Sequence, residues 1–369
     1  MNGKSPEDKR VLIPALLTIC LGLFLAAVLG NPGSGGQAGE GPSGGRSEIR
    51  PLSESGGPED RETVGAAGRE GESAGKGAET DGAPEAGSAP GGKPAENAVD
   101  LRHVYSKREL EKLSRQAEEE DAGFARAASM AASPSRIIVL PHHRPAAGLA
   151  ARALSWAAGS WQPLPRTIIL LGPNHKNLGS DILALDWSWR TDAGIVEPDK
   201  EAFKGIYEAG AASRGDDSFR GEHSVTMALP LVAEYFPGAK VVPLIFRWRC
   251  EPEKLARLWQ ALEPALGPDT LIILSADFSH GLNSEQAAGK DQETLKLLEA
   301  RDWRSVAALD SSSLDCPTLL GWLVKYAGEK GWGAFTLLSE SDSGELLGSR
   351  EQGVTSYLIL SAGGEDDAR

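Results

Sequence analysis

At residues 137–143 the chain reads IIVLPHH, and this stretch decides its fold class. Four consecutive apolar residues, three of them β-branched, are typical of a strand that is buried on both faces. Similar short apolar runs follow at residues 167–171, 241–245, 271–274 and 356–360. Runs of this kind predict the interior strands of a largely parallel sheet.

Helical patterns separate these runs. They occupy residues 101–120, 149–158, 199–208, 225–235, 253–262, 284–298 and 319–327. Strands that alternate with helices predict an α/β fold, a three-layer sandwich whose central sheet is mostly parallel or mixed. In such sheets ligands bind beyond the carboxyl ends of the strands, so the residues that follow each strand are the candidates for a site.

The first 30 residues differ from the rest of the chain. Residues 1–10 are positively charged through Lys4, Lys9 and Arg10, and residues 11–30 carry no charge. An apolar run of about 20 residues is long enough to cross a bilayer as a helix, which predicts a transmembrane anchor. A cleaved secretory signal is the alternative, although its apolar core is usually about 7–15 residues long. The charges predict a cytoplasmic N-terminus, with the globular domain outside the cytoplasm or secreted after cleavage.

The remaining boundaries follow from composition. Residues 31–97 consist largely of Gly, Ser, Pro, Ala, Glu and Lys with few large apolar side chains. Such a segment buries too little surface to offset its chain entropy, so we expect a disordered linker. Residues 98–363 then form one α/β domain, which is long enough to bury a substantial core. Residues 364–369 form a short acidic tail.

Charge and motifs exclude several classes of function. The formal net charge is −14, which argues against nucleic acid as a partner, because phosphate binding needs a basic face. Three cysteines are too few for a disulfide framework, and we expect Cys250 and Cys316 to be free thiols. The chain has no phosphate-binding glycine loop, so no nucleotide cofactor is expected, and it has no Gly-x-Ser-x-Gly nucleophile motif.

Histidines follow three of the predicted strands directly. His142 follows the first strand, His175 ends the motif GPNH after the second, and His280 ends the motif DFSH after the strand at 271–274. Because strand ends meet at one edge of a parallel sheet, we expect these imidazoles to lie together and to bind a metal. Asp277, three residues before His280, is placed to orient that imidazole or to contact a substrate with it.

Two further segments leave both a structural and a functional interpretation open. Glu222-His223-Ser224 stands at the start of a predicted helix, where a carboxylate and a hydroxyl suit the unpaired backbone N–H groups. The same residues would also lie at the edge of the sheet that carries the histidines. Cys316 precedes Pro317 and an apolar helix, and a buried free cysteine in such a place usually fills space.

These motifs, in this order, resemble those of the Memo family, whose bacterial and archaeal members are called AmmeMemoRadiSam system protein B. The resemblance covers about residues 98–362. It implies a fold like that of the class III extradiol ring-cleaving dioxygenases, which use non-haem iron. It also implies a set of site residues: the metal ligands His142, His175 and Cys316, and the pocket residues Asp277, His280, Glu222 and His223.

The chain departs from the family pattern at two points. His143-Arg144-Pro145 stands where the family usually has Ala-Gly-Tyr, and an extra histidine there could compete with His142. Cys316 is followed directly by Pro317, whereas the family usually reads Cys-Gly-x-x-Pro, so the loop that places the thiol is shorter.

The function implied by the resemblance is metal-dependent redox chemistry, oxidase-like or dioxygenase-like, on a small molecule with iron or copper. Two alternatives use the same residues. One is a non-catalytic module that binds a metal or a peptide, and the other is a zinc-dependent hydrolase, because histidine and cysteine also suit zinc. The family name further implies a functional partnership with a radical-SAM protein.

Overall fold

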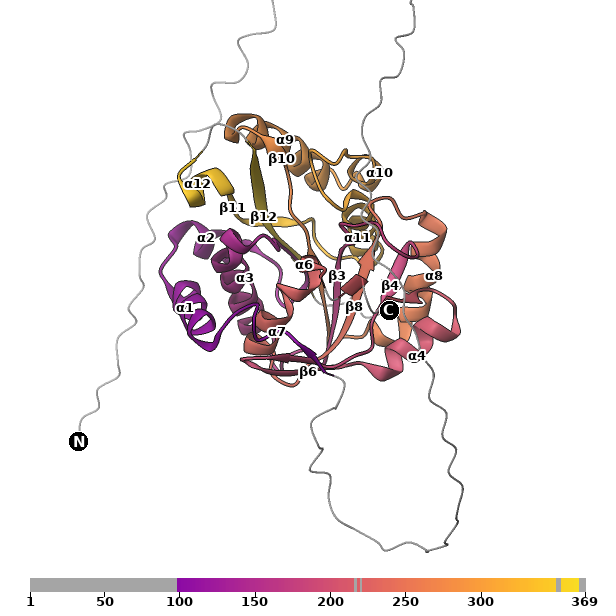
Figure 1. Ribbon diagram of the computed structural model, residues 1–369. Helices are drawn as coiled ribbons and strands as arrows, with labels where there is room; N and C mark the ends of the chain where they lie inside the picture. Colours follow the sequence, from indigo (N-terminus) through magenta and orange to yellow (C-terminus); the bar gives the residue numbers. More distant parts are fainter. Residues whose placement is uncertain (1–97, 216–217, 220, 350–352, 365–369) are drawn as a thin grey trace, which may run out of the picture. The chain divides into compact units, whose positions relative to one another are not determined.

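A computed structural model of the chain describes residues 98–215, 218–219, 221–349 and 353–364 (Figure 1). Within these residues twelve strands join in one mixed sheet. The predicted segments 1–10, 11–30 and 31–97 lie outside the described residues, as does the predicted tail 364–369 apart from Gly364.

Five parallel strands form the centre of the sheet. In spatial order they are β6 (Gly194–Pro198), β8 (Lys240–Phe246), β3 (Thr167–Pro173), β9 (Thr270–Ser275) and β2 (Ser135–Leu140). Four of them were predicted from their apolar runs. The carboxyl ends of β3, β9 and β2 therefore lie side by side, which is the arrangement that the predicted site requires.

Antiparallel and short strands complete the sheet on both sides. Next to β2 lies the antiparallel β12 (Val354–Gly363), which was also predicted. The remaining strands are β1 (Val99–Asp100), β4 (Ile182–Ala184), β5 (Trp189–Thr191), β7 (Ser213–Arg214), β10 (His280–Leu282) and β11 (Thr336–Asp342). Sequence reasoning did not find these six, because most are two or three residues long and carry no periodic pattern.

Alternate residues of the central strands pack into two separate apolar cores. Ile138 and Leu140 of β2 belong to one core, whereas Ile137 and Val139 belong to the other. The alternation arises because successive side chains of a strand point to opposite faces of the sheet. Two cores, one on each face, make the architecture a three-layer α/β sandwich, and the predicted fold class is confirmed.

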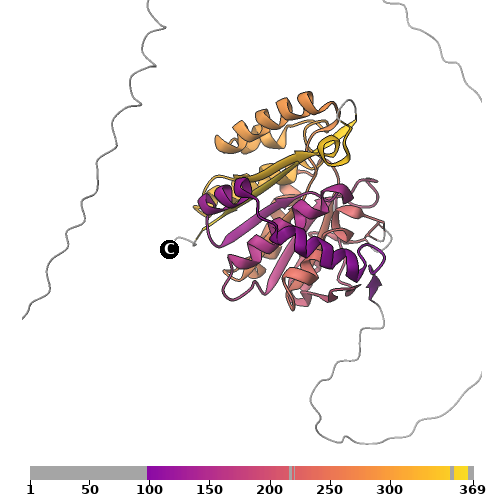
Figure 2. The same ribbon diagram turned by 90° about the vertical axis from the view of Figure 1, so that its left-hand side faces the viewer.

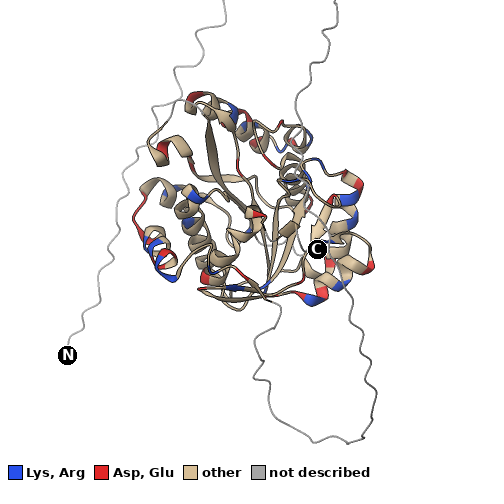
Figure 3. Ribbon diagram, in the orientation of Figure 1, with Lys and Arg blue, Asp and Glu red and all other residues tan. Residues whose placement is uncertain are grey.

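Helices cover both faces, as Figures 1 and 2 show from two directions. The first core is covered by α1 (Lys107–Glu118), α2 (Ala122–Met130), α3 (Ala147–Gly159), α6 (His223–Thr226) and α7 (Leu229–Tyr235). The second is covered by α4 (Lys200–Glu208), α8 (Pro252–Leu262), α9 (Ser284–Glu299), α10 (Trp303–Ala307) and α11 (Pro317–Glu329). The short α12 (Ser343–Leu347) precedes β12. Charged residues gather on the outer helices (Figure 3).

One of the predicted helices is divided into two helices in the structure. Residues 225–235 were expected to form a single helix, but α6 ends at Thr226 and α7 begins at Leu229. Pro230 stands in the first turn of α7, and its ring nitrogen cannot donate to the preceding turn, so the helix restarts there. The short α6 is thereby free to place His223 independently of α7.

The prediction of a membrane anchor requires a correction. Among the residues that the structure describes, no helix is both long enough and apolar enough to cross a bilayer. Residues 11–30, on which the prediction rested, lie outside the described residues. The predictions of a membrane partner and of a domain anchored outside the cytoplasm are contradicted by this finding.

The contact between α10 and α11 gives a test of the packing. A side chain at Gly321 in α11 would place its Cβ 2.6 Å from the Trp303 carbonyl oxygen and 2.7 Å from the Ala307 Cβ. We expect Gly321→Ala to lower the free energy of unfolding by about 1–3 kcal/mol, measured by urea denaturation. Gly328 in the same helix has open space around it, so Gly328→Ala should instead raise that free energy by roughly 0.5–1 kcal/mol. Equal effects of the two substitutions would contradict this packing.

Candidate metal centre

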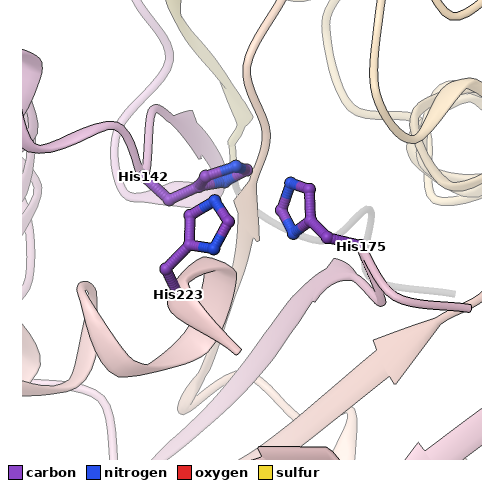
Figure 4. Close-up of side chains that lie close together, drawn as sticks. All are labelled: His142, His175 and His223. Atoms are coloured by element: carbon purple, nitrogen blue, oxygen red, sulfur yellow. The ribbon is translucent and has the colours of Figure 1, made fainter. Parts of the chain in front are cut away.

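Three histidines face one another beyond the carboxyl ends of the central strands (Figure 4). His142 follows β2, His175 follows β3, and His223 is the first residue of α6. The ring centroids of His142 lie 5.0 Å from those of His175 and of His223, and the His175 and His223 centroids are 4.1 Å apart. The sequence prediction that strand-end histidines meet at this edge is therefore confirmed for His142 and His175.

The three histidines differ in their exposure to solvent. The side chain of His142 is 1% exposed, that of His175 is 32% exposed and that of His223 is 52% exposed. His142 thus forms the inner wall, and the site opens to solvent past the other two rings.

Glu222 holds His175. Its Oε1 lies 2.7 Å from His175 Nδ1, and its Oε2 accepts the His175 backbone N–H at 2.9 Å. Burial alone would lower the pKa of His175, but the hydrogen bond and charge of Glu222 raise it overall. Burial likewise opposes ionisation of Glu222, yet its bonds to His175 and to the Ser224 backbone lower its pKa to about 2. In the neutral ring Nδ1 carries the proton that the carboxylate accepts, and Nε2 carries the free lone pair.

His142 is oriented in a similar way. Its Nδ1 lies 3.2 Å from Ser275 Oγ, and its backbone N–H donates to Asp277 Oδ1 at 3.1 Å. Its Nε2 faces two carboxylates, with Asp315 Oδ2 at 3.3 Å and Asp277 Oδ2 at 3.5 Å. Burial lowers the pKa of His142 well below its usual value, and the neighbouring His175 and His223 lower it further. The ring is therefore neutral near pH 7, the form in which imidazole binds metals.

Asp315 is a site residue that sequence reasoning missed. Its Oδ2 also lies 3.9 Å from His175 Nε2, so this carboxylate stands between the two inward-facing nitrogens. Its Oδ1 is buried and has no hydrogen-bond partner among the described residues. Burial raises the pKa of Asp315, and the negative charge of Asp277 raises it further. The feature of the sequence that could have indicated Asp315 is its position directly beside the predicted ligand Cys316.

Cys316 lies beside the site, close enough to Asp315 for the two side chains to interact. Its side chain belongs to the apolar core on the α11 side of the sheet. Close potential ligand atoms form two groups among the described residues, His142/His175/His223 and His142/Asp277/Asp315, and Cys316 is in neither. Burial raises the pKa of its thiol well above the usual value, with Asp315 adding to the effect. The structure thus brings together two of the three predicted ligands.

His280 lies at the start of β10, where its backbone N–H donates to the Ser312 carbonyl at 3.1 Å. Its Nδ1 is buried and has no hydrogen-bond partner in the described structure. Burial lowers the pKa of His280, and the charge of Asp277 opposes that shift. The two side chains are therefore close enough to interact electrostatically.

The residues that depart from the family pattern have partners of their own. His143 Nδ1 lies 2.7 Å from the Tyr357 hydroxyl, and His143 is in neither ligand group. Arg144 donates to the Val104 carbonyl at 2.6 Å and stacks on the Tyr105 ring. The change thus gives His143 a partner in Tyr357 and ties the loop after β2 to the segment before α1.

Gly172 lets α6 approach β3. A Cβ at this position would lie 2.6 Å from Ser224 Oγ and 2.8 Å from Ser224 Cβ. Ser224 uses the space to donate from its hydroxyl to the Pro173 carbonyl at 2.8 Å. This contact fixes the segment that carries Glu222 and His223 against the end of β3.

The side chains at this edge fit a divalent transition metal ion. Neutral imidazole nitrogens suit iron, copper and zinc, and a carboxylate is a common further ligand. The buried, unpaired Oδ1 of Asp315 is the kind of atom that a cation would satisfy. Glu222 would serve as the outer carboxylate that orients a metal-binding histidine.

Removing that outer carboxylate should weaken metal binding. We expect Glu222→Ala to lower the affinity for Fe(II) or Zn(II) by roughly 10–100-fold, measured by competition with a chelator. Asp302→Ala is the matched control, because Asp302 also caps a short helix, α10, but lies outside the site. Equal affinities of the two variants would contradict the role of Glu222.

The sequence was also compared with known proteins. Residues 102–359 match the profile of the family described as Memo-like protein. A MEMO1 family protein of Pyrobaculum aerophilum is 30% identical over 205 residues, which cover 53% of this chain and 72% of that protein. Similar proteins occur in Aquifex aeolicus, at 28% identity over 53% and 74% of the two chains, and in Saccharolobus solfataricus, at 26% over 54% and 72%.

Proposed function

Since the chain belongs to the Memo-like protein family, we propose that it is a metal-dependent redox protein that acts on a small molecule. His142 and His175 hold the metal, which is iron or copper. The observation that carries the proposal is the convergence of their two Nε2 atoms on the Asp315 carboxylate. When bound, such an ion supplies electron transfer and open coordination positions for a substrate.

The protein's own groups supply orientation and proton transfer. Glu222 orients His175 and Ser275 orients His142 through hydrogen bonds at their Nδ1 atoms. His280 is the general base, because burial keeps its imidazole neutral and its Nδ1 has no other partner in the described residues. His223, the most exposed of the three clustered histidines, stands where a substrate would enter.

The experiment is oxygen uptake by the full-length chain loaded separately with Fe(II), Cu(II) or Zn(II), with a panel of catechols, thiols and ascorbate. We expect the iron-loaded or copper-loaded chain to consume oxygen and the zinc-loaded chain to consume none. His280→Ala should keep its metal and lose about 10²–10⁴-fold in rate, the usual contribution of a general acid or base.

Two other outcomes would overturn the proposal. Tight metal binding without oxygen uptake on any of these compounds would leave a binding module for metal or peptide. Hydrolysis of ester or amide probes by the zinc-loaded chain alone would favour a zinc hydrolase, for which histidine and carboxylate ligands are equally suitable.

A further inference from the structure

The carboxylate of Asp315 occupies the place that a third ligand would take. Two donors bound to one ion at about 2.0–2.2 Å lie roughly 3–3.5 Å from each other. Asp315 Oδ2 lies 3.3 Å from His142 Nε2 and 3.9 Å from His175 Nε2. One oxygen of Asp315 therefore lies within 4 Å of the Nε2 atoms of both histidines.

We propose that Asp315, not Cys316, is the third protein ligand, so that two histidines and one carboxylate hold the metal. The inference rests on the metal-dependent function proposed above. It assigns the ligand set of this chain differently from the histidine, histidine and cysteine set that the family resemblance implies.

The direction of the chain before α11 supports this assignment. Asp315 and Cys316 are consecutive and their side chains interact with each other, but their other neighbours differ. The thiol enters the apolar core with Leu314, Leu319 and Leu320, whereas the carboxylate faces the histidines. The backbone N–H of Asp277 donates to Asp315 Oδ2 at 3.1 Å and holds the carboxylate in place.

His223 is a poorer third ligand than Asp315. Its ring is stacked on His175 with an angle of 21° between the planes and centroids 4.1 Å apart. The lone pair of an imidazole nitrogen lies in the ring plane, and two nearly parallel planes meet far beyond the ~2 Å of a metal–nitrogen bond. The planes of His142 and His175 cross at 83°, so their lone pairs can converge on one ion.

Asp277 is also a poorer candidate. Its Oδ2 lies 3.5 Å from His142 Nε2, but its Oδ1 already accepts the His142 backbone N–H at 3.1 Å. Asp315, in contrast, approaches both histidines and keeps an oxygen without a hydrogen-bond partner among the described residues. We therefore assign Asp277 to positioning of the loop after β2.

The ligand set changes the expected metal. Thiolate ligands favour Cu(I), whereas two histidines and a carboxylate with open positions are typical of non-haem Fe(II) proteins. We expect this chain to prefer Fe(II) to Cu(I) and to lack the thiolate bond that a cysteine ligand would form.

Co(II) titration of the full-length chain tests the assignment without any activity measurement. A thiolate bound to Co(II) produces a strong near-ultraviolet charge-transfer band, and a carboxylate does not. We expect the difference spectrum between the wild type and Cys316→Ser to be flat, with Co(II) affinities within about threefold of each other. Asp315→Asn, which is nearly isosteric, should lose more than the roughly 10–100-fold that removal of an outer partner costs.

A second variant, designed to acquire the thiolate band, makes the test decisive. Asp315→Cys combined with Cys316→Ser should create the thiolate band, because it places sulfur where the carboxylate stands. A band in the wild type that disappears in Cys316→Ser, or unchanged Co(II) affinity in Asp315→Asn, would overturn the ligand assignment while the metal-dependent function survives. A wild type that binds no Co(II), Fe(II) or Zn(II) would overturn the proposed function and this inference together.

Discussion

The chain that carries both His142→Ala and His175→Ala is expected to bind no iron, copper or zinc, whereas the unaltered chain binds about one ion per molecule. These two residues supply the inward-facing Nε2 atoms, and each is fixed through its Nδ1 by Ser275 or Glu222. Removing both leaves the exposed His223 and the carboxylates of Asp277 and Asp315, a set without the two inward-facing imidazoles. Elemental analysis of the purified, reconstituted proteins measures the metal content.

His103→Ala provides the control for the loss of a histidine as such. His103 is exposed and lies before α1, away from the candidate metal centre. We expect its removal to leave the metal content unchanged. Stoichiometric metal in the double variant, or equal losses in the control, would show that the ion binds elsewhere on the chain.

Phe278→Ala should cause the largest loss of stability of the single substitutions considered. The ring is fully buried in the core on the α11 side, between Asp277 and Ser279 of the site loop. Truncating a buried phenylalanine costs about 3–5 kcal/mol of the free energy of unfolding, through lost transfer energy and the cavity left behind. Denaturant unfolding at 25 °C measures this difference.

Phe335 gives the comparison for Phe278. It packs against the same core but is only partly buried, so Phe335→Ala should cost less than half as much as Phe278→Ala. Metal affinity should fall in Phe278→Ala and stay constant in Phe335→Ala, because only Phe278 supports the loop that carries Asp277. Equal losses of stability in the two variants would contradict the role of Phe278 as an anchor.

The strands in the interior of the fold could be predicted from the sequence. Apolar runs such as residues 137–140 are typical of strands buried on both faces, and such strands favour a central sheet with helices on each side. The placement of His142 and His175 followed, because the ends of neighbouring parallel strands meet at one edge. Short edge strands and the break between α6 and α7 were missed, since they depend on pairing partners and on Pro230.

The detail of the site was harder to predict for a geometric reason. Asp315 and Cys316 are consecutive, and the conformation of the backbone before Pro317 decides which side chain faces the histidines. That backbone conformation cannot be predicted from the residue types or from their spacing in the sequence. The resemblance directed attention to the cysteine, whereas the structure places the carboxylate beside His142 and His175.

The close approach of Gly172 to Ser224 has a consequence for how this site evolves. The two positions share one volume, which the serine side chain fills. A methyl group at 172 would displace the segment that begins α6, and with it Glu222 and His223, unless residue 224 became smaller at the same step. We expect relatives to change the two positions together, as a compensating pair. A library that varies either position alone would sample mostly inactive chains.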